Sequence, residues 1–222
     1  MGIAVTQKLK IVVLVSGGGS NLQSIIDHCQ SSAINGSIEC VISDVADAYA
    51  LERAKQNNIP GFAPEQILIT RKALEEFISQ TLEPFVFDLI VLAGFMKVLS
   101  AEFVEQRLGK MINIHPSLLP KYPGLHTHER AIADGAKKHG ASVHFVTPEL
   151  DGGPIIARRE VDVREDDTPE VLQKRVLVEE HKLLPGVIQL FAEKRLHWNN
   201  GDILFDNKSI PETGIPGDLF HD

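Results

Sequence analysis

An amide and an imidazole side chain stand two residues apart at the end of an apolar run. The run Met111-Ile112-Asn113-Ile114-His115 is followed directly by Pro116. If this run forms a strand, successive side chains point to opposite faces, so Asn113 and His115 share one face. An amide donor beside a titratable ring can stabilise a developing oxyanion and move a proton. Polar residues also end many strands without a catalytic role, so the pair alone leaves both interpretations open.

A carboxylate elsewhere in the chain is a candidate partner for the imidazole. Asp151 lies in the segment Glu149-Leu150-Asp151-Gly152-Gly153-Pro154, where Asp-Gly is first of all a turn signal. A carboxylate close to His115 would stabilise the imidazolium and raise its pKa. The sequence does not place the two groups next to each other, so a plain turn is the alternative.

A glycine-rich loop follows the first apolar run of the chain. Its sequence is Gly17-Gly18-Gly19-Ser20-Asn21. Glycines let backbone N–H groups converge, and the positive N-terminus of a following helix attracts anions, so the loop predicts a phosphate site. Leu22 stands where G-x-G-x-x-G requires its third glycine, which disfavours a nicotinamide oxidoreductase. The alternative is a tight strand-to-helix turn.

A glutamate interrupts the apolar stripe of the longest predicted helix. At about 100° per residue, the apolar residues between Leu172 and Phe191 form one broad stripe, and Glu180 lies near its centre. A carboxylate in this position is costly to bury without a partner. That partner is either a cationic ligand amine or an Arg or Lys of the protein itself. Pro185 interrupts the same stripe and changes its helical phase.

Several histidines raise the question of a metal ion. His126 and His128 could ligate zinc, but no Cys or patterned carboxylate joins them in a known zinc spacing. His144 lies in the alternating run Ser142-Val143-His144-Phe145-Val146 and is equally consistent with a buried core histidine. We therefore expect no metal site.

Strand-like and helix-like segments alternate through residue 115. We expect strands at 10–15, 38–43, 59–63, 87–93 and 111–115, and helices at 20–29, 46–56, 71–82 and 101–107. This order predicts a doubly wound, mainly parallel Rossmann-like α/β sheet with helices on both faces. Further on, a helix at 128–136, strands at 141–146 and 155–163, and a long helix from 168 to about 193 predict an antiparallel addition and a long C-terminal helix. We expect a single domain over 1–222, with a core at about 9–200, a strand or two within the final thirty residues and a loose tail at 201–222.

The bulk composition limits the possible functions. The chain has 222 residues, a net charge of -8 and two cysteines. An acidic chain is a poor non-specific nucleic-acid binder, because such binding needs a basic face. Cys29 and Cys40 lie in apolar stretches without metal spacing and predict reduced thiols. No apolar run approaches the roughly 20 residues that span a bilayer, and no signal peptide is recognisable, so we expect a cytoplasmic protein.

Several segments, taken in order, resemble the phosphoribosylglycinamide formyltransferases, folate-dependent enzymes of purine biosynthesis in the formyltransferase family. The similarity covers about residues 9 to 200. The matching segments are Ser16-Gly17-Gly18-Gly19-Ser20-Asn21-Leu22, Leu92-Ala93-Gly94-Phe95-Met96, Asn113-Ile114-His115-Pro116-Ser117-Leu118-Leu119-Pro120, Lys121-Tyr122-Pro123-Gly124-Leu125-His126-Thr127-His128, Ser142-Val143-His144-Phe145-Val146 and Glu149-Leu150-Asp151-Gly152-Gly153-Pro154. Related tRNA formyltransferases carry a further C-terminal domain and formyltetrahydrofolate hydrolases an N-terminal regulatory domain, and we expect neither here.

The resemblance implies a role for each matching position. The catalytic residues implied are Asn113, His115 and Asp151. The site for glycinamide ribonucleotide is implied for Gly19, Ser20 and Asn21, which would bind its phosphate, and for Glu180, which would receive its glycyl amine. The folate site is implied for Arg71, Met96, Lys97, Val98, Leu99, Asn113, Thr147, Pro148, Glu149, Leu150 and Asp151. Lys97 stands where relatives often have Arg, and Pro148 where some have Asp.

The implied reaction is direct formyl transfer from the co-substrate 10-formyltetrahydrofolate to the amine of glycinamide ribonucleotide, through a tetrahedral intermediate. It needs no metal, nucleic acid or membrane, and a monomer or weak homodimer is expected. Hydrolysis of the same folate, with water in place of the amine, is the competing enzyme function. A non-catalytic nucleotide-binding module is the competing class of protein; it would bind phosphate ligands without formyl transfer.

Overall fold

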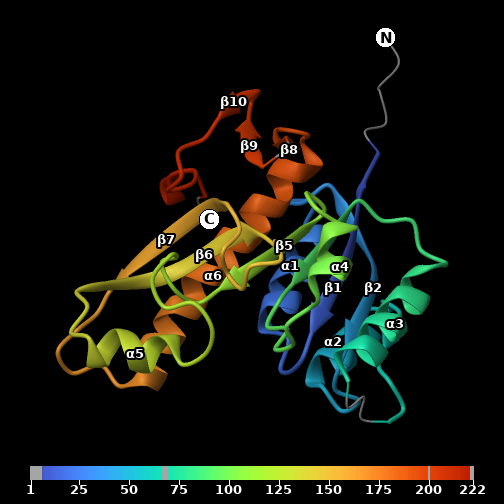
Figure 1. Cartoon of the computed structure of the whole chain (residues 1–222), viewed down its shortest axis with the longest axis horizontal. Coiled ribbons are helices and arrows are strands. Elements are labelled where there is room, and N and C mark those ends of the chain that lie inside the picture. Colours follow the sequence, from blue (N-terminus) through green and yellow to red (C-terminus); the bar gives the residue numbers. More distant parts are fainter. Residues whose placement is uncertain (1–6, 67–69, 200, 221–222) are drawn as a thin grey trace.

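The computed structural model describes residues 7–66, 70–199 and 201–220, and within these residues seven strands form one sheet in the order β3-β2-β1-β4-β5-β6-β7 (Figure 1). Its strands are β1 (Leu9–Val15), β2 (Gly36–Ser43), β3 (Gly61–Phe62), β4 (Leu89–Leu92), β5 (Met111–His115), β6 (Lys138–Phe145) and β7 (Ile155–Asp162). The helices are α1 (Ser20–Gln30), α2 (Tyr49–Gln56), α3 (Arg71–Leu82), α4 (Ala101–Glu105), α5 (Thr127–Ala133) and α6 (Pro169–Ala192), followed near the end by the 3-10 helix η1 (Gly217–Leu219).

The strands from β3 to β5 run parallel. β1 pairs with β2 and β4, β2 also pairs with β3, and β4 with β5, all in parallel. β6 pairs antiparallel with both β5 and β7. The expected mainly parallel sheet with an antiparallel addition and a long C-terminal helix is therefore confirmed. The strand order reverses at β1, and ligands of such sheets bind above the carboxyl ends of the strands at the point of reversal.

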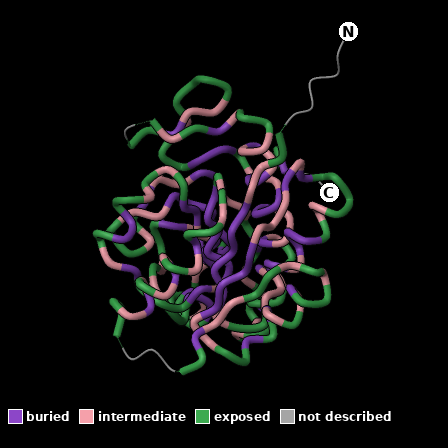
Figure 2. The backbone as a smooth tube through the Cα atoms, turned by 90° about the vertical axis from the view of Figure 1, so that its right-hand side faces the viewer, coloured by how far each residue is buried: buried purple, intermediate pink, exposed green. Residues whose placement is uncertain are grey.

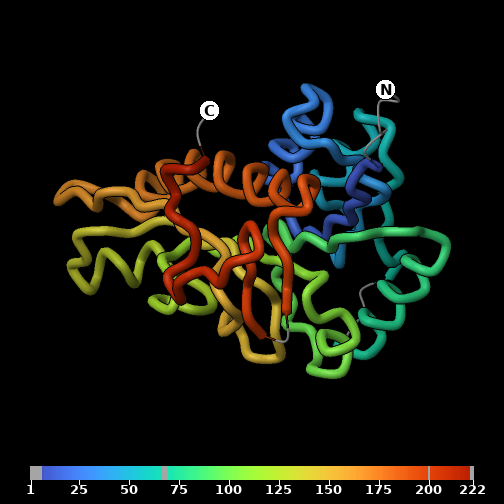
Figure 3. The backbone as a smooth tube through the Cα atoms, turned by 90° about the horizontal axis from the view of Figure 1, so that it is seen from above, coloured from blue at the N-terminus to red at the C-terminus, as the bar shows by residue number. Residues whose placement is uncertain are grey.

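Helices cover both faces of the sheet. One face packs against α1, α2 and α6, with Ile25, Ala54 and Leu183 among the buried residues. The other face packs against α3 and α4, through side chains such as Ile78 and Phe103. β1 contributes to both layers because its successive side chains point to opposite faces, which explains its continuous apolar sequence. Figure 3 shows α1 and α6 together on one side of the molecule.

The starts of the helices differ in how their free N–H groups are satisfied. Thr70, Ser100 and Thr168 precede α3, α4 and α6, and each hydroxyl accepts a hydrogen bond from the N–H group three residues on. Such a cap satisfies one of the N–H groups that the first helical turn leaves unpaired. α1 follows Gly19, which has a φ of 70° and no capping side chain. The start of α1 is therefore open to an external acceptor.

Some element boundaries differ from the expected ones. The second helix begins at Tyr49 rather than at residue 46, because residues 44–48 form the loop that leaves β2. The third strand is only Gly61–Phe62, since this edge strand pairs with β2 alone. The strand expected at 87–93 comprises Leu89–Leu92, the residues that pair with β1.

The C-terminal segment is packed, so the expected loose tail is wrong for residues 201–220. β8 (Leu196–Asn199), just before this segment, and β9 (Asp202–Phe205) and β10 (Lys208–Ser209) within it form a three-stranded antiparallel sheet, where one or two strands were expected. The chain then returns to β7, where Ile215 bridges Ala157. Ile215 and Phe220 are buried and extend the core over this edge of the sheet. Figure 2 shows the buried segments gathered in the interior, with exposed loops around them.

Candidate active site

The candidate residues gather above the carboxyl ends of the parallel strands. β1 ends at Val15 before the glycine loop, β4 ends at Leu92 before residues 94–99, and β5 ends at His115. Neighbouring parallel strands end at the same edge of a sheet, so these loops lie along one edge. The N–H group of Ser16 donates to the Gly94 carbonyl at 3.1 Å, which joins the first loop directly to the second.

Asn113 is held by His144 on the neighbouring antiparallel strand. The register of β5 and β6 places the two residues directly opposite each other. Nδ1 of His144 lies 2.9 Å from the Phe145 carbonyl, which can only accept, so this nitrogen carries the proton. In the neutral ring Nε2 of His144 is then an acceptor, and it lies 3.1 Å from Nδ2 of Asn113. The amide nitrogen is thereby fixed in orientation, because a flipped amide would place its oxygen against the unprotonated Nε2.

His144 is a residue of the site that the sequence did not identify. The residue is 2% exposed, as a core histidine would be, but its ring contacts both Asn113 and Asp151. The signal is the alternation of residues 142–146, which gives His144 a defined face. That face becomes informative only when the register with β5 is known.

His115 lies between a backbone carbonyl and Asp151. Nε2 of the ring donates to the Tyr122 carbonyl over 2.9 Å, and Nδ1 lies 3.5 Å from Oδ2 of Asp151. The expected proximity of acid and imidazole is therefore present. Burial lowers the pKa of His115, and the Tyr122 carbonyl and Asp151 offset this only in part. The expected net rise in the pKa of His115 is wrong: Asp151 acts to raise this pKa, but desolvation outweighs its attraction.

Asp151 is a buried carboxylate with several partners. Its Oδ2 accepts a hydrogen bond from the Gly124 N–H at 2.8 Å, and its Oδ1 lies 3.6 Å from Nε2 of His144. Burial acts to raise the pKa of Asp151, but His144, the Gly124 N–H and His115 together hold it below its usual value. Asp151 is therefore ionised at neutral pH.

The turn that contains Asp151 lies very close to the backbone at the end of β6. Asp151 itself has a φ of 50°. A Cβ atom on Gly153 would lie 1.8 Å from the Phe145 carbonyl oxygen, so no other residue fits while β6 and this turn stay in contact. The Asp-Gly-Gly sequence is thus both a turn signal and the means by which the carboxylate reaches His115.

A small cavity lies beside these residues and contains most of the predicted folate residues. It has a volume of about 80 Å3. Its predicted members are Lys97, Val98, Leu99, Asn113, Thr147, Pro148, Glu149, Leu150 and Asp151, and His144 also lines it. Met96 and Arg71 are exposed and are not among its lining residues; Arg71 is the first residue of α3.

The glycine loop is tightly placed against α2. A Cβ atom on Gly19 would lie 2.6 Å from the Cβ of Ala50, and the φ of 70° at Gly19 also favours glycine. Arg53 of α2 holds the loop from the side, with its Nε donating to the Gly18 carbonyl at 2.8 Å. Gly19, Ser20 and Asn21 therefore form the uncapped start of α1 in a fixed conformation, as a phosphate cradle requires.

Asn21 and Glu180 meet although they are far apart in sequence. Nδ2 of Asn21 donates to Oε2 of Glu180 at 2.6 Å, and both residues are more than nine-tenths buried. Burial raises the pKa of Glu180. Among the described residues Glu180 forms no ion pair with an Arg or Lys, so that explanation of its position is wrong; the neighbouring Glu179 pairs with Arg159 instead. Oδ1 of Asn21 is buried without a hydrogen-bond partner in the described part of the chain.

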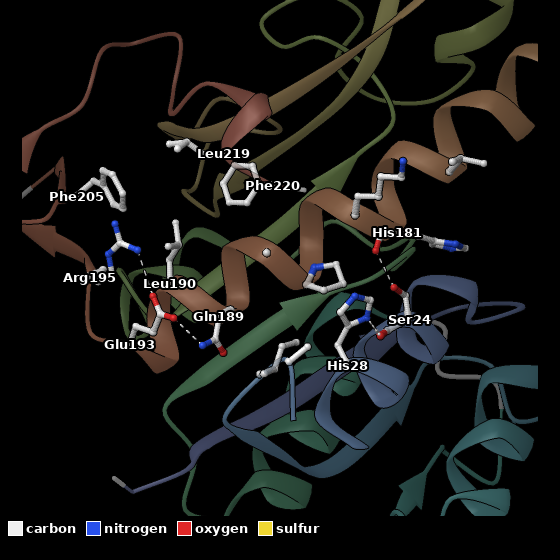
Figure 4. A pocket seen from close by; sticks show the side chains of 16 residues that line it. Ser24, His28, His181, Gln189, Leu190, Glu193, Arg195, Phe205, Leu219 and Phe220 are labelled. Carbon is white, nitrogen blue, oxygen red and sulfur yellow. Dashed lines mark hydrogen bonds and ion pairs between the residues drawn. The ribbon is translucent and has the colours of Figure 1, made fainter. Parts of the chain in front are cut away.

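A larger cavity lies elsewhere, between α1, α6 and the C-terminal segment, and contains none of the predicted residues (Figure 4). Its volume is about 580 Å3. Ser24 and His28 line it from α1, and His181 from α6, with the Ser24 hydroxyl donating to the His181 carbonyl at 2.9 Å. Volume alone therefore does not identify the site, because none of the catalytic candidates faces this cavity.

The remaining histidines in the described residues show no arrangement that would hold a metal. Across residues 7–66, 70–199 and 201–220, no group of three or more His, Cys, Asp or Glu side chains could hold a metal ion. His128 instead pairs with the fully buried His139, Nδ1 to Nε2 at 3.1 Å, and His126 is exposed beside Glu129. Within the described chain, no helix has the length and apolar character needed to cross a membrane.

Known proteins share this chain's sequence and fold over nearly its whole length. The sequence pattern of the formyl transferase family matches residues 9–188. Phosphoribosylglycinamide formyltransferase of Escherichia coli is 44% identical over 214 residues, which cover 95% of this chain and 100% of the relative. The solved structure of the enzyme of that name from Coxiella burnetii is 46% identical, with a TM-score of 0.89 over 94% of this chain and 99% of the other. This chain therefore belongs to the formyl transferase family, among its phosphoribosylglycinamide formyltransferases.

Proposed function

We propose that this chain transfers the formyl group of 10-formyltetrahydrofolate to the amine of glycinamide ribonucleotide, a step of de novo purine biosynthesis. The observation that carries the proposal is the meeting of Asn113, His115 and Asp151 at the sheet edge that also bears the glycine loop. The activity named for the similar enzymes supports the same reaction.

The reaction proceeds by direct attack. The glycyl amine nitrogen bonds to the formyl carbon, whose oxygen becomes an oxyanion. Nδ2 of Asn113 and the protonated Nδ1 of His115 donate hydrogen bonds to this oxygen; losing one such donor costs about 10² to 10³ in rate. A proton then moves from the attacking nitrogen to N10 of the folate, assisted by Asp151 directly or through water. The bond between carbon and N10 breaks, which releases tetrahydrofolate and the formylated nucleotide.

The charges of the site suit these steps. Asp151 has a pKa below its usual value and is ionised at neutral pH. Burial lowers the pKa of His115, so the ring is a weak base before the substrates bind. A developing oxyanion and the Asp151 carboxylate both favour the imidazolium, so the positive charge is stabilised most in the intermediate.

The nucleotide is held at two points. Gly19, Ser20 and Asn21 bind its phosphate through the uncapped start of α1. Glu180 accepts a hydrogen bond from the glycyl amine, and the unpartnered Oδ1 of Asn21 is a second acceptor in the same buried place. Orienting the amine and the formyl group in one crevice lowers the barrier by up to about 7–11 kcal/mol in ideal cases.

The folate lies along residues 96–99 and 147–151, with Asn113 beside its formyl group. The cavity of about 80 Å3 is smaller than the roughly 300–1,000 Å3 of most small-molecule pockets. The ligand therefore widens the cavity or extends beyond it. Met96 and Arg71 are exposed, and they suit the part of the folate that lies outside.

One assay tests the proposal. Purified protein is mixed with 10-formyltetrahydrofolate, and absorbance is followed with and without glycinamide ribonucleotide. Turnover only with the nucleotide is expected, and replacing His115 by Ala should abolish it while nucleotide binding stays measurable. Near-normal turnover of the His115→Ala variant would refute the role of His115.

The same assay separates the competing functions. Release of tetrahydrofolate without the nucleotide would identify a 10-formyltetrahydrofolate hydrolase. Phosphate binding without any formyl transfer would identify a non-catalytic module. We further propose that residues 1–222 act as one domain, because one core cluster joins residues from Ile11 to Phe220, and that the protein is cytoplasmic and a monomer or weak homodimer.

A further inference from the structure

Three side chains form a polar cluster between the two substrate loops. Ser16 follows β1 and precedes the glycine loop, Asp44 follows β2, and Lys97 lies in the loop after β4. The Ser16 hydroxyl donates to Oδ1 of Asp44 at 2.5 Å, and Nζ of Lys97 lies 3.7 Å from Oδ2 of the same carboxylate. One carboxylate therefore contacts both loops.

The burial of Asp44 calls for an explanation. Its side chain is 4% exposed, whereas that of Lys97 is 54% exposed. Removing a carboxylate from water is costly unless hydrogen bonds and an opposite charge compensate, and Ser16 and Lys97 supply both. Asp44 has no part in the reaction or in either substrate site as proposed above. Its contacts indicate that it holds the loops together.

Two further hydrogen bonds join the second loop to Ser16. In the second loop, the Met96 N–H donates a hydrogen bond to the Ser16 hydroxyl at 2.8 Å. Ser16 also donates its own N–H to the Gly94 carbonyl at 3.1 Å. Residues 94–97 are thus fastened at several points to the residue that precedes the phosphate cradle. Movement of either loop disturbs the other through Ser16 and Asp44.

We propose that Asp44 is a positioning residue that couples the two substrate sites: through Ser16 and Lys97 it makes occupancy of the nucleotide site favour folate binding, and the reverse. This inference rests on the proposed function. A ligand that holds the glycine loop in its binding position also holds residues 94–97 through the cluster, so the second ligand meets a loop that is already in place. Such coupling is reciprocal between two binding equilibria and typically amounts to about 5- to 150-fold.

Calorimetry on the full chain measures this coupling. Tetrahydrofolate carries no formyl group, so it forms an unreactive ternary complex with glycinamide ribonucleotide. For the wild type we expect the Kd of the nucleotide to fall at least about 5-fold when tetrahydrofolate is saturating. In Asp44→Ala the ratio should fall to about one, while kcat at saturating substrates changes less than the KM for the folate.

Asp47 supplies the matched control, because it is an exposed acid three residues further on. Asp47→Asn should keep the wild-type coupling. If circular dichroism shows that Asp44→Ala is unfolded, Asp44→Asn is measured in its place. This variant keeps an oxygen for Ser16 but loses the charge opposite Lys97, so its coupling between the two sites should be reduced. Wild-type coupling in a folded Asp44 variant would overturn the inference. So would a wild-type enzyme that turns over normally without coupling, whereas a wild type that neither binds nor formylates the nucleotide contradicts the proposed function instead.

Discussion

Replacing His144 by Phe tests whether its ring orients the catalytic amide. The substitution keeps an aromatic ring in a position that is 2% exposed, but removes the Nε2 that accepts from Asn113 at 3.1 Å. A neutral hydrogen bond contributes about 0.5–1.5 kcal/mol net, which corresponds to a 2- to 13-fold preference for the correct amide orientation. A flipped amide presents an oxygen instead of a donor to the oxyanion. Without this preference the two amide orientations are about equally populated, so we expect kcat to fall by about 2-fold, far below the roughly 10²- to 10³-fold loss of a complete donor.

Steady-state kinetics and nucleotide binding are the measurements for this variant. The Kd of glycinamide ribonucleotide should stay within about 2-fold, since His144 contacts Asn113 and Asp151 rather than the glycine loop. His144→Gln restores an acceptor and should recover part of kcat. In the background of Asn113→Ala, His144→Phe should cost little more, because residues that act as a unit are non-additive. A folded His144→Phe enzyme with wild-type kcat, or fully additive losses, would refute the reasoning.

Two further predictions concern stability. Burial is the main cause, followed by the nearby His128 and His115, that lowers the pKa of His139 to about 4 from an ordinary value of 6.5. Between these two pH values the unfolded chain therefore binds more protons than the folded chain. The free energy of unfolding should fall by up to about 3 kcal/mol as the pH drops from 6.5 to 4, and His139 should contribute nothing to this pH dependence above 6.5. Urea unfolding at pH 7 and pH 4.5 measures this, and an equally steep pH dependence in His139→Phe would contradict it. Gly19→Ala should lower stability by about 1–3 kcal/mol and weaken nucleotide binding, because its Cβ would lie 2.6 Å from that of Ala50 at a φ of 70°. Thermal unfolding and the KM for the nucleotide check this, and wild-type values for both would show that the loop is not constrained as described.

Predictions that rest on local geometry agree with the structure. The strand at Met111–His115 has the expected bounds, and Asn113 and His115 share a face because side chains alternate along any strand. The helix at Arg71–Leu82 also has the expected bounds. Thr70 directly before it caps the first turn, because its hydroxyl accepts a hydrogen bond from a helical N–H group that would otherwise be unpaired. The predicted strand boundaries were wrong where hydrogen bonding to a neighbouring strand sets the ends. The edge strand β3, for example, is short because only β2 lies beside it.

Contacts between distant segments followed from the sequence only in part. The proximity of Asp151 and His115 was a hypothesis until the turn at Gly153 brought the carboxylate back against β6. The antiparallel register that places His144 opposite Asn113 left no local signal, because a register depends on two strands at once.

The sequence by itself determined the order of strands and helices, the glycine loop before α1 and the shared face of the amide and imidazole, since each depends on a few neighbouring residues. The tertiary structure alone decided which groups share one crevice. Asn21 meets Glu180 across 159 positions and Asp44 joins two loops, and the packing of helices on the sheet sets such distances. Burial likewise comes from packing, and it reversed the expected direction of the His115 pKa.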